Sequence, residues 1–199
     1  FYSYGTNFGN YGWYSLNLSL MQPNLSYLQN TIKSDSVIIE DNHFIAYTDW
    51  QSALRTYVGS AIMWNPSAYA DKNSVFALAK EFCKYYFGEA AGNTVYEYIV
   101  ACENRLEEIR NGNVSGFNYY VRDTDYTLGD RNFVSDSQEI KHYLTANSYK
   151  IYEKAFLTEY ISKIKNVYEA ASGEYKNRVA SALFTVELSY FANYKYYLT

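Results

Sequence analysis

The chain has 199 residues, of which 48% are apolar and 19% charged, so it is long and apolar enough for a globular domain and is not a disordered chain. Its formal net charge is −4 and no basic stripe is present, so we expect no nucleic-acid partner. No run of about 18 apolar residues occurs, so we expect no membrane insertion.

The first 47 residues resemble strand and loop material. Residues 1–4 favour a short strand that ends at Gly5, and the glycine-rich residues 7–14 favour a loop. The apolar run at 35–40 favours a strand buried on both faces, as in a parallel sheet. Because two short strands do not form a stable sheet alone, we expect partner strands outside this chain, which would then be part of a longer protein.

The segment 48–64 carries the signals of a helix. Thr48 and Gln51 fit a capping box at its start, and Asn65 followed by Pro66 marks its end. Apolar residues recur at intervals of three and four, which predicts one buried face. The residues expected on that face are Trp50, Leu54, Tyr57, Ala61 and Trp64.

The same periodicity predicts four further helices, at about 74–87, 93–110, 137–171 and 174–197. Gly88, Asn111 and Gly173 mark the boundaries between them. The short connections predict an antiparallel helical array over residues 48–199. The residues expected to point inward include Val75, Leu78, Phe82, Tyr85, Val95, Ile99, Cys102, Leu106, Ile109, Ile140, Leu144, Ile151, Ala155, Ile161, Ile164, Tyr168, Tyr175, Val179, Leu183, Val186 and Tyr190.

The titratable residues of these segments carry few chemical signals. The charged run 103–110 is expected to be the solvated face of its helix. Cys83 and Cys102 are expected to be buried, unpaired thiols, because they lie at unequal distances from the turn between their helices. The aspartates of the polar segment 111–136 do not have the spacing of a calcium loop, so we expect no metal and no cofactor.

Three segments resemble a bacterial family, domain-of-unknown-function family 4838. They are residues 54–66, which end in Met-Trp-Asn-Pro, residues 82–91, which include Tyr-Tyr-Phe-Gly-Glu-Ala-Ala, and residues 96–99. Likenesses at 4–8, 23–42 and 167–191 extend the resemblance over most of the chain, whereas Phe87 before Gly88 departs from the family pattern. The Trp-Asn-Pro boundary is also similar to the post-barrel region of glycoside hydrolase families 84 and 67.

The resemblance implies a fold that is mainly α. Residues 48–199 would form a C-terminal helical array, preceded in residues 1–47 by the last strands of a (β/α)8-type barrel. The rest of the same polypeptide would complete that barrel and would therefore be a partner of this chain.

The implied barrel also indicates where a ligand would bind, because ligand-facing residues lie at the C-terminal ends of barrel strands. Glycosidases use two separated carboxyl groups, but Glu40 and Asp41 are consecutive and point to opposite faces of a strand. The catalytic carboxylates are therefore expected outside this chain. A solvated strand end and an exposed loop histidine are the plain alternatives to a binding role. The implied substrate-binding residues are Tyr4, Asn7, Trp13, Tyr14, Glu40, Asp41 and His43.

Two functions follow from these expectations. The first is that of the C-terminal part of a secreted or cell-surface glycoside-hydrolase-like protein that acts on extracellular glycans. The alternative is a non-catalytic carbohydrate-binding module or a structural helical module. The 25 tyrosines suit either, because a tyrosine ring can pack in a core or form a platform for a ligand.

Overall fold

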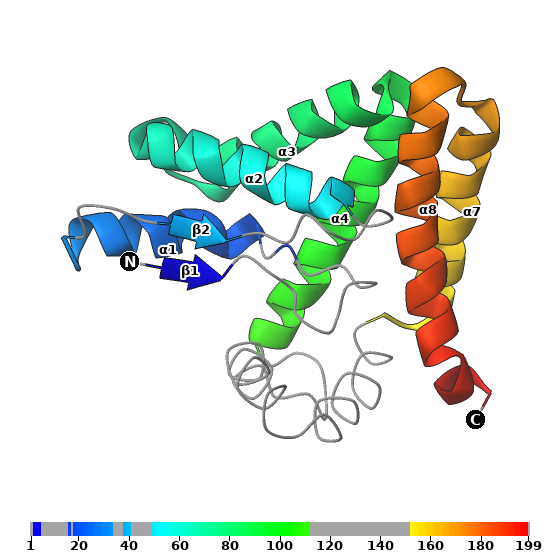
Figure 1. Cartoon of the computed structure of the whole chain (residues 1–199). Coiled ribbons are helices and arrows are strands. Elements are labelled where there is room, and N and C mark those ends of the chain that lie inside the picture. Colours follow the sequence, from blue (N-terminus) through cyan, green and yellow to red (C-terminus); the bar gives the residue numbers. More distant parts are fainter. Residues whose placement is uncertain are drawn as a thin grey trace.

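The computed structural model describes residues 2–4, 16, 18–33, 38–40, 49–111 and 152–198, and these are mainly helical, as the sequence predicted (Figure 1). In chain order the elements are β1 (Tyr2–Tyr4), α1 (Leu18–Asn30), β2 (Ile38–Glu40), α2 (Asp49–Trp64), the 3-10 helix η1 (Pro66–Tyr69), α3 (Lys72–Phe87), α4 (Glu89–Arg110), α7 (Lys154–Ala170), α8 (Gly173–Asn193) and the 3-10 helix η2 (Tyr194–Tyr197).

The assignment of the first residues to the last strands of a (β/α)8-type barrel is wrong. In the described residues, β1 and β2 are three residues each and pair only with one another, in parallel, with Tyr2 opposite Ile38 and Tyr4 opposite Glu40. A barrel needs strands that alternate with helices around a closed ring. Every described element after β2 is instead helical, because the sequence keeps a helical period through the described parts of residues 49–198.

The buried face of α2 differs from the predicted one. Trp50 and Leu54 are fully buried, but Tyr57 is 38% exposed and Trp64 is 93% exposed. The predicted positions 57 and 64 are therefore wrong. The observed face repeats every four residues, because the helix is covered on that side by α1, α3 and α8. It consists of Trp50, Leu54, Val58 and Ile62.

The chain turns sharply between α2 and α3, at the predicted stop. The side chain of Asn65 accepts a hydrogen bond from the Ala68 backbone N–H at 3.3 Å. Asp71 and Ser74 then form a capping box, in which the Asp71 carboxylate accepts from the Ser74 backbone N–H at 2.8 Å. This cap starts α3 at residue 72, slightly before the predicted start at residue 74. The Thr48–Gln51 capping box predicted for α2 lies outside the described residues, since Thr48 is not among them.

Helices α3 and α4 pack closely, with Gly88 alone between them. Gly88 has a φ of 83°, a conformation that glycine adopts without strain, and α4 then begins at Glu89 rather than near residue 93. A Cβ atom on Gly92 would lie 2.4 Å from the Cys83 carbonyl oxygen. The absence of a side chain at Gly92 thus sets how closely the two helices approach.

Helices α7 and α8 form an antiparallel pair that packs on α4 and α3 (Figure 1). The predicted long helix over 137–171 is described only from Lys154, and positions 140, 144 and 151 lie outside the described residues. Ile164, Val179 and Val186 are buried as predicted. Tyr85 and Tyr175 are 68% and 41% exposed, so their predicted inward positions are wrong.

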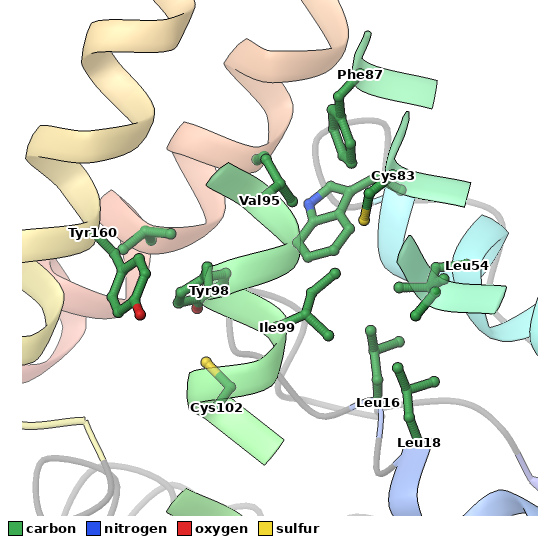
Figure 2. Packing of buried hydrophobic residues seen from close by; sticks show 14 of the residues in the cluster. Leu16, Leu18, Leu54, Cys83, Phe87, Val95, Tyr98, Ile99, Cys102 and Tyr160 are labelled. Carbon is green, nitrogen blue, oxygen red and sulfur yellow. The ribbon is translucent and has the colours of Figure 1, made fainter. Parts of the chain in front are cut away.

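One apolar core joins the two parts of the chain. Figure 2 shows Leu16 and Leu18 beside Leu54 and Ile99, and all four belong to the same buried cluster. Tyr98 and Tyr160 extend this cluster toward α7 on the other side of α4. The proposed division into residues 1–47 and 48–199 stays a prediction, but the described residues before 48 share the core of the helical array.

Candidate functional site

The two strand ends that the sequence indicated lie side by side at the level of the backbone. Tyr4 and Glu40 are the last residues of β1 and β2 and face each other in the parallel register. The C-terminal residues of the two strands therefore lie at the same end of the sheet. The other predicted binding residues lie outside the part of the chain that the structure describes: Asn7, Trp13, Tyr14, Asp41 and His43.

A buried carboxylate of α4 holds the start of α1. Glu103 is 0% exposed, so its expected place on a solvated helix face is wrong. Its Oε1 accepts from the Leu18 backbone N–H at 2.9 Å, and its Oε2 accepts from the Ser19 backbone N–H at 3.1 Å and from the Ser19 hydroxyl at 2.8 Å. Both oxygens are thus used to cap a helix that lies more than 80 residues earlier in the sequence.

The first turn of α1 depends on this external cap for a physical reason. The first N–H groups of a helix have no partner within the helix, and the positive end of the helix dipole favours an anion there. Pro23 lies one turn further on and has no N–H to donate to the Ser19 carbonyl, so the first turn also has a weakened internal ladder. Leu16 and Leu18 are buried beside it, which keeps water from the same groups.

An aromatic row runs across α2, α3 and α8. It consists of Tyr57, Phe82, Tyr86, Arg178 and Tyr175. The ring centroids of Tyr57 and Phe82 are 5.8 Å apart, and the Phe82 and Tyr86 rings stack at 4.9 Å. The Arg178 guanidinium lies 4.8 Å from the Tyr86 ring centroid and 5.9 Å from that of Tyr175. The row is therefore continuous by ring contact and cation–π contact.

Polar groups accompany the aromatic row. The Tyr57 hydroxyl donates to Glu81 Oε1 at 3.0 Å, and partial burial together with this bond raises the pKa of Tyr57. Arg178 donates to the Tyr86 backbone carbonyl and to the Glu174 carboxylate, each at 3.1 Å. Rings with hydroxyl tips beside carboxylates suit a ligand that has both C–H faces and hydroxyl groups.

A shallow hollow of about 250 Å³ opens between α4 and the start of α7. Arg105 lines it and forms ion pairs with Glu108 and Glu153, each at 2.7 Å. One guanidinium is thus paired with two carboxylates, so the contact links α4 to the residue before α7 and leaves the lining with a formal charge of −1. Its lining consists of Ala101, Asn104, Arg105, Glu108, Glu153 and Phe156.

The two cysteines are buried and free, as predicted. Burial raises the pKa of the Cys83 thiol to about 12 and raises the pKa of Cys102 well above its ordinary value. A thiol in this state stays protonated at neutral pH and is a poor nucleophile or metal ligand. Both residues therefore act as packing groups.

Two features are absent from the described residues. In residues 2–4, 16–33, 38–40, 49–111 and 152–198, with the gap at 17, no group of three His, Cys, Asp or Glu side chains is placed to hold a metal ion. Within those same ranges, no helix has the length and apolar character that a membrane span requires.

Comparison with known proteins gives one match. Residues 1–100 match the model of a protein family described as a domain of unknown function (DUF4838). No curated protein and no solved structure matches the chain.

Proposed function

Since the chain belongs to the DUF4838 family, we propose that it binds carbohydrate within a glycoside-hydrolase-like protein that acts on extracellular glycans. The proposal takes the end of the β1–β2 sheet as the binding region. It takes the helical array as the support that holds this region in place. Secretion or attachment at the cell surface is part of the same proposal.

The register of the sheet is the observation that carries the proposal. Tyr4 and Glu40 lie opposite one another at the ends of parallel strands, so an aromatic residue and an acidic residue begin the two segments that carry the other candidate residues. Sugars are recognised by an aromatic face for their C–H groups and by carboxylates or amides for their hydroxyl groups. Trp13, Tyr14, Asp41 and His43 supply the same chemistry in the sequence that follows the two strands.

Binding rather than bond cleavage is proposed for these residues. A pair of catalytic carboxyl groups lies about 5–5.5 Å apart in retaining enzymes and about 6.5–9.5 Å apart in inverting ones. Glu40 and Asp41 are consecutive, and Glu108 and Glu153 are both engaged by Arg105. We therefore assign no catalytic pair in this chain.

The test is a binding and hydrolysis assay on the full-length protein with soluble cello-, xylo- and chito-oligosaccharides. The variants Trp13→Ala and Glu40→Gln should each weaken binding at least about tenfold, which corresponds to about 1.4 kcal/mol. Trp64→Ala is the matched control, because Trp64 is exposed on the far end of α2, and it should leave affinity unchanged. Absence of binding and turnover on the whole panel would refute the proposal.

A second candidate is carbohydrate binding by the helical array itself. The aromatic row favours it, since Tyr57 and Tyr175 keep part of their rings in solvent and the exposed Tyr85 belongs to the same helix as Phe82 and Tyr86. In this case Tyr85→Ala and Tyr175→Ala should weaken binding to the same oligosaccharide panel. Trp13→Ala should then leave the affinity at the wild-type value, which separates the two candidates.

A further inference from the structure

The hollow between α4 and the start of α7 has the composition of a small-ligand site. Such sites combine an apolar surface with a few convergent polar groups. The partly exposed residues of its lining are Ala101, Arg105 and Phe156, and the exposed ones, which form its rim, are Asn104, Glu108 and Glu153. Neither β1 nor β2 lines the hollow, so the inference drawn from it goes beyond the proposed function.

The Phe156 ring gives the hollow an apolar face of fixed orientation. It packs against the rings of Tyr98, Tyr152 and Tyr160, at centroid distances of 6.3, 6.0 and 5.0 Å. Phe156 lies in the first turn of α7 and Tyr160 lies four residues further on, so the two rings stand on the same side of the helix. A ring held in this way offers a flat surface to the C–H groups of a ligand.

The polar lining supplies both hydrogen-bond donors and acceptors. Arg105 donates to Glu108 Oε2 and to Glu153 Oε1, each at 2.7 Å, and its side chain is less exposed than either carboxylate. Within the described part of the chain, no group donates a hydrogen bond to the second oxygen of either carboxylate. Asn104 adds an amide carbonyl and an NH2 group. The ion pairs thus hold two carboxylates in place and leave each with an acceptor oxygen.

We propose that this hollow binds one neutral sugar ring. A sugar hydroxyl both donates and accepts hydrogen bonds, so it matches carboxylate oxygens beside an amide, and the C–H face of the sugar matches the Phe156 ring. A cationic ligand would compete with the Arg105 guanidinium, which already engages both carboxylates. An acidic sugar would be repelled by the formal charge of −1 on the lining. The volume of about 250 Å³ lies below the range of about 300–1,000 Å³ of sites for drug-sized ligands, which suits a single ring.

The first experiment compares sugars of different charge on the full-length wild-type protein. Ligand-observed NMR titration measures the Kd of D-glucose, D-xylose, N-acetyl-D-glucosamine and D-glucuronate at low salt. At least one neutral sugar should bind about fivefold or more tightly than glucuronate, because one like charge about 4 Å away costs a factor of this size even in water. A protein that binds none of the neutral monosaccharides, or that binds glucuronate equally well, overturns the inference.

Variants then assign the binding to the hollow. Asn104→Ala and Glu153→Gln should each weaken binding of the neutral sugar about fivefold or more, and both residues are exposed, so Tm should stay near the wild-type value. Glu153→Gln also takes the formal charge of the lining from −1 to zero, so the preference for a neutral over an acidic sugar should decrease. Wild-type affinity in both variants overturns the inference.

Glu97→Gln is the matched control. Glu97 also lies on α4, is 61% exposed and forms an ion pair with a residue of α7, Lys163, at 4.0 Å, but it does not line the hollow. This variant should keep the wild-type affinity for the neutral sugar. A loss equal to that in Glu153→Gln would show that the effect comes from surface charge in general, and the inference would be overturned.

Failure of this inference is distinguishable from failure of the proposed function. Protein that binds a monosaccharide in a manner sensitive to Glu153→Gln, but binds none of the oligosaccharides of the first panel, refutes the proposed function and supports the hollow as a separate site. Protein that binds the oligosaccharides in a manner sensitive to Trp13→Ala, but whose monosaccharide binding is unchanged in Glu153→Gln, overturns this inference alone.

Discussion

The helical array and the β1–α1–β2 region are held in place by different kinds of interaction. The array, α2 to α8, buries long apolar faces against one another, with Trp50, Leu54 and Ile164 among its fully buried residues. In its described residues, the β1–α1–β2 region has two strands of three residues and one helix, and α1 is attached there mainly through leucines and one carboxylate. The comparison teaches that stability in the array is spread over many contacts, whereas the described part of the first region is attached through fewer.

The largest loss in the free energy of unfolding should come from a substitution at the centre of the array. Trp50 is fully buried, meets the Phe87 ring edge-on at a centroid distance of 5.8 Å and donates to Thr185, so it joins three helices. Trp50→Ala should lower the free energy of unfolding by about 3–5 kcal/mol. Trp64→Ala removes the same side chain from an exposed position of the same helix and should change it by less than about 0.5 kcal/mol. Urea unfolding followed by circular dichroism measures both, and equal losses would contradict the assignment of the core.

The next largest loss of stability should be confined to the β1–α1–β2 region. Glu103→Ala leaves the buried N–H of Leu18 and the partly buried N–H of Ser19 without their carboxylate, at a cost of about 1–3 kcal/mol for the buried group and less for the other. Hydrogen exchange should show lost protection in α1 and unchanged protection in α7 and α8. Uniform loss of protection over all helices would show that the two regions unfold as one unit, and the comparison drawn above would then fail.

A third change tests the close approach of two array helices. Gly92→Ala places a methyl group against the Cys83 carbonyl, which forces α3 and α4 apart at a cost of about 1–3 kcal/mol. Gly173→Ala is the control, because its Cβ would meet no atom within 4 Å and only its φ of 58° is strained. That strain costs about 1–2 kcal/mol. Because the Cβ added at Gly92 would lie within 3.0 Å of backbone atoms of both Cys83 and Lys84, thermal unfolding should rank Gly92→Ala below Gly173→Ala. The reverse order would contradict the packing of α3 on α4.

The smallest predicted effect is a decrease in folding stability at alkaline pH. Burial raises the pKa of the folded Cys83 thiol to about 12, whereas the thiol in the unfolded chain has its ordinary pKa of 9.0. The unfolded state therefore releases a proton first, and stability is complete below about pH 9 and falls as the pH rises above it. Cys83 alone should contribute a loss of about 1.4 kcal/mol between about pH 8 and pH 10. Urea unfolding of Cys83→Ala should show a shallower decline over the same interval, and parallel curves would show that the thiol is not buried.

The positions of most helices in the array could be predicted from the sequence, because the signals that end a helix are local. Asn65 with Pro66, Gly88 and Asn111 ended helices as predicted, since each acts on the backbone of its own turn. The faces of the helices were less predictable. Tyr85 and Trp64 fit the apolar period but lie in solvent, because burial depends on whether a neighbouring helix covers that turn.

The candidate site was harder to predict from the sequence than the helical array. The pairing of Tyr4 with Glu40 agrees with the expectation that both lie at strand ends, but the barrel in which they were placed is wrong. Glu103 was missed because it belongs to a charged run and its partner lies 84–85 residues away in sequence. One signal was present: Glu103 follows Ile99 by four residues and precedes Leu106 by three, which places it on the edge of the buried stripe.

The reach of the Glu103 contact along the chain also affects the order of events during synthesis. A ribosome releases Leu18 and Ser19 long before it releases the glutamate that caps them. In that interval the first turn of α1 has neither its partner carboxylate nor, because of Pro23, a complete internal ladder. The N-terminal part of this chain is thus translated first, but the cap on the first turn of α1 can form only after α4 has emerged from the ribosome.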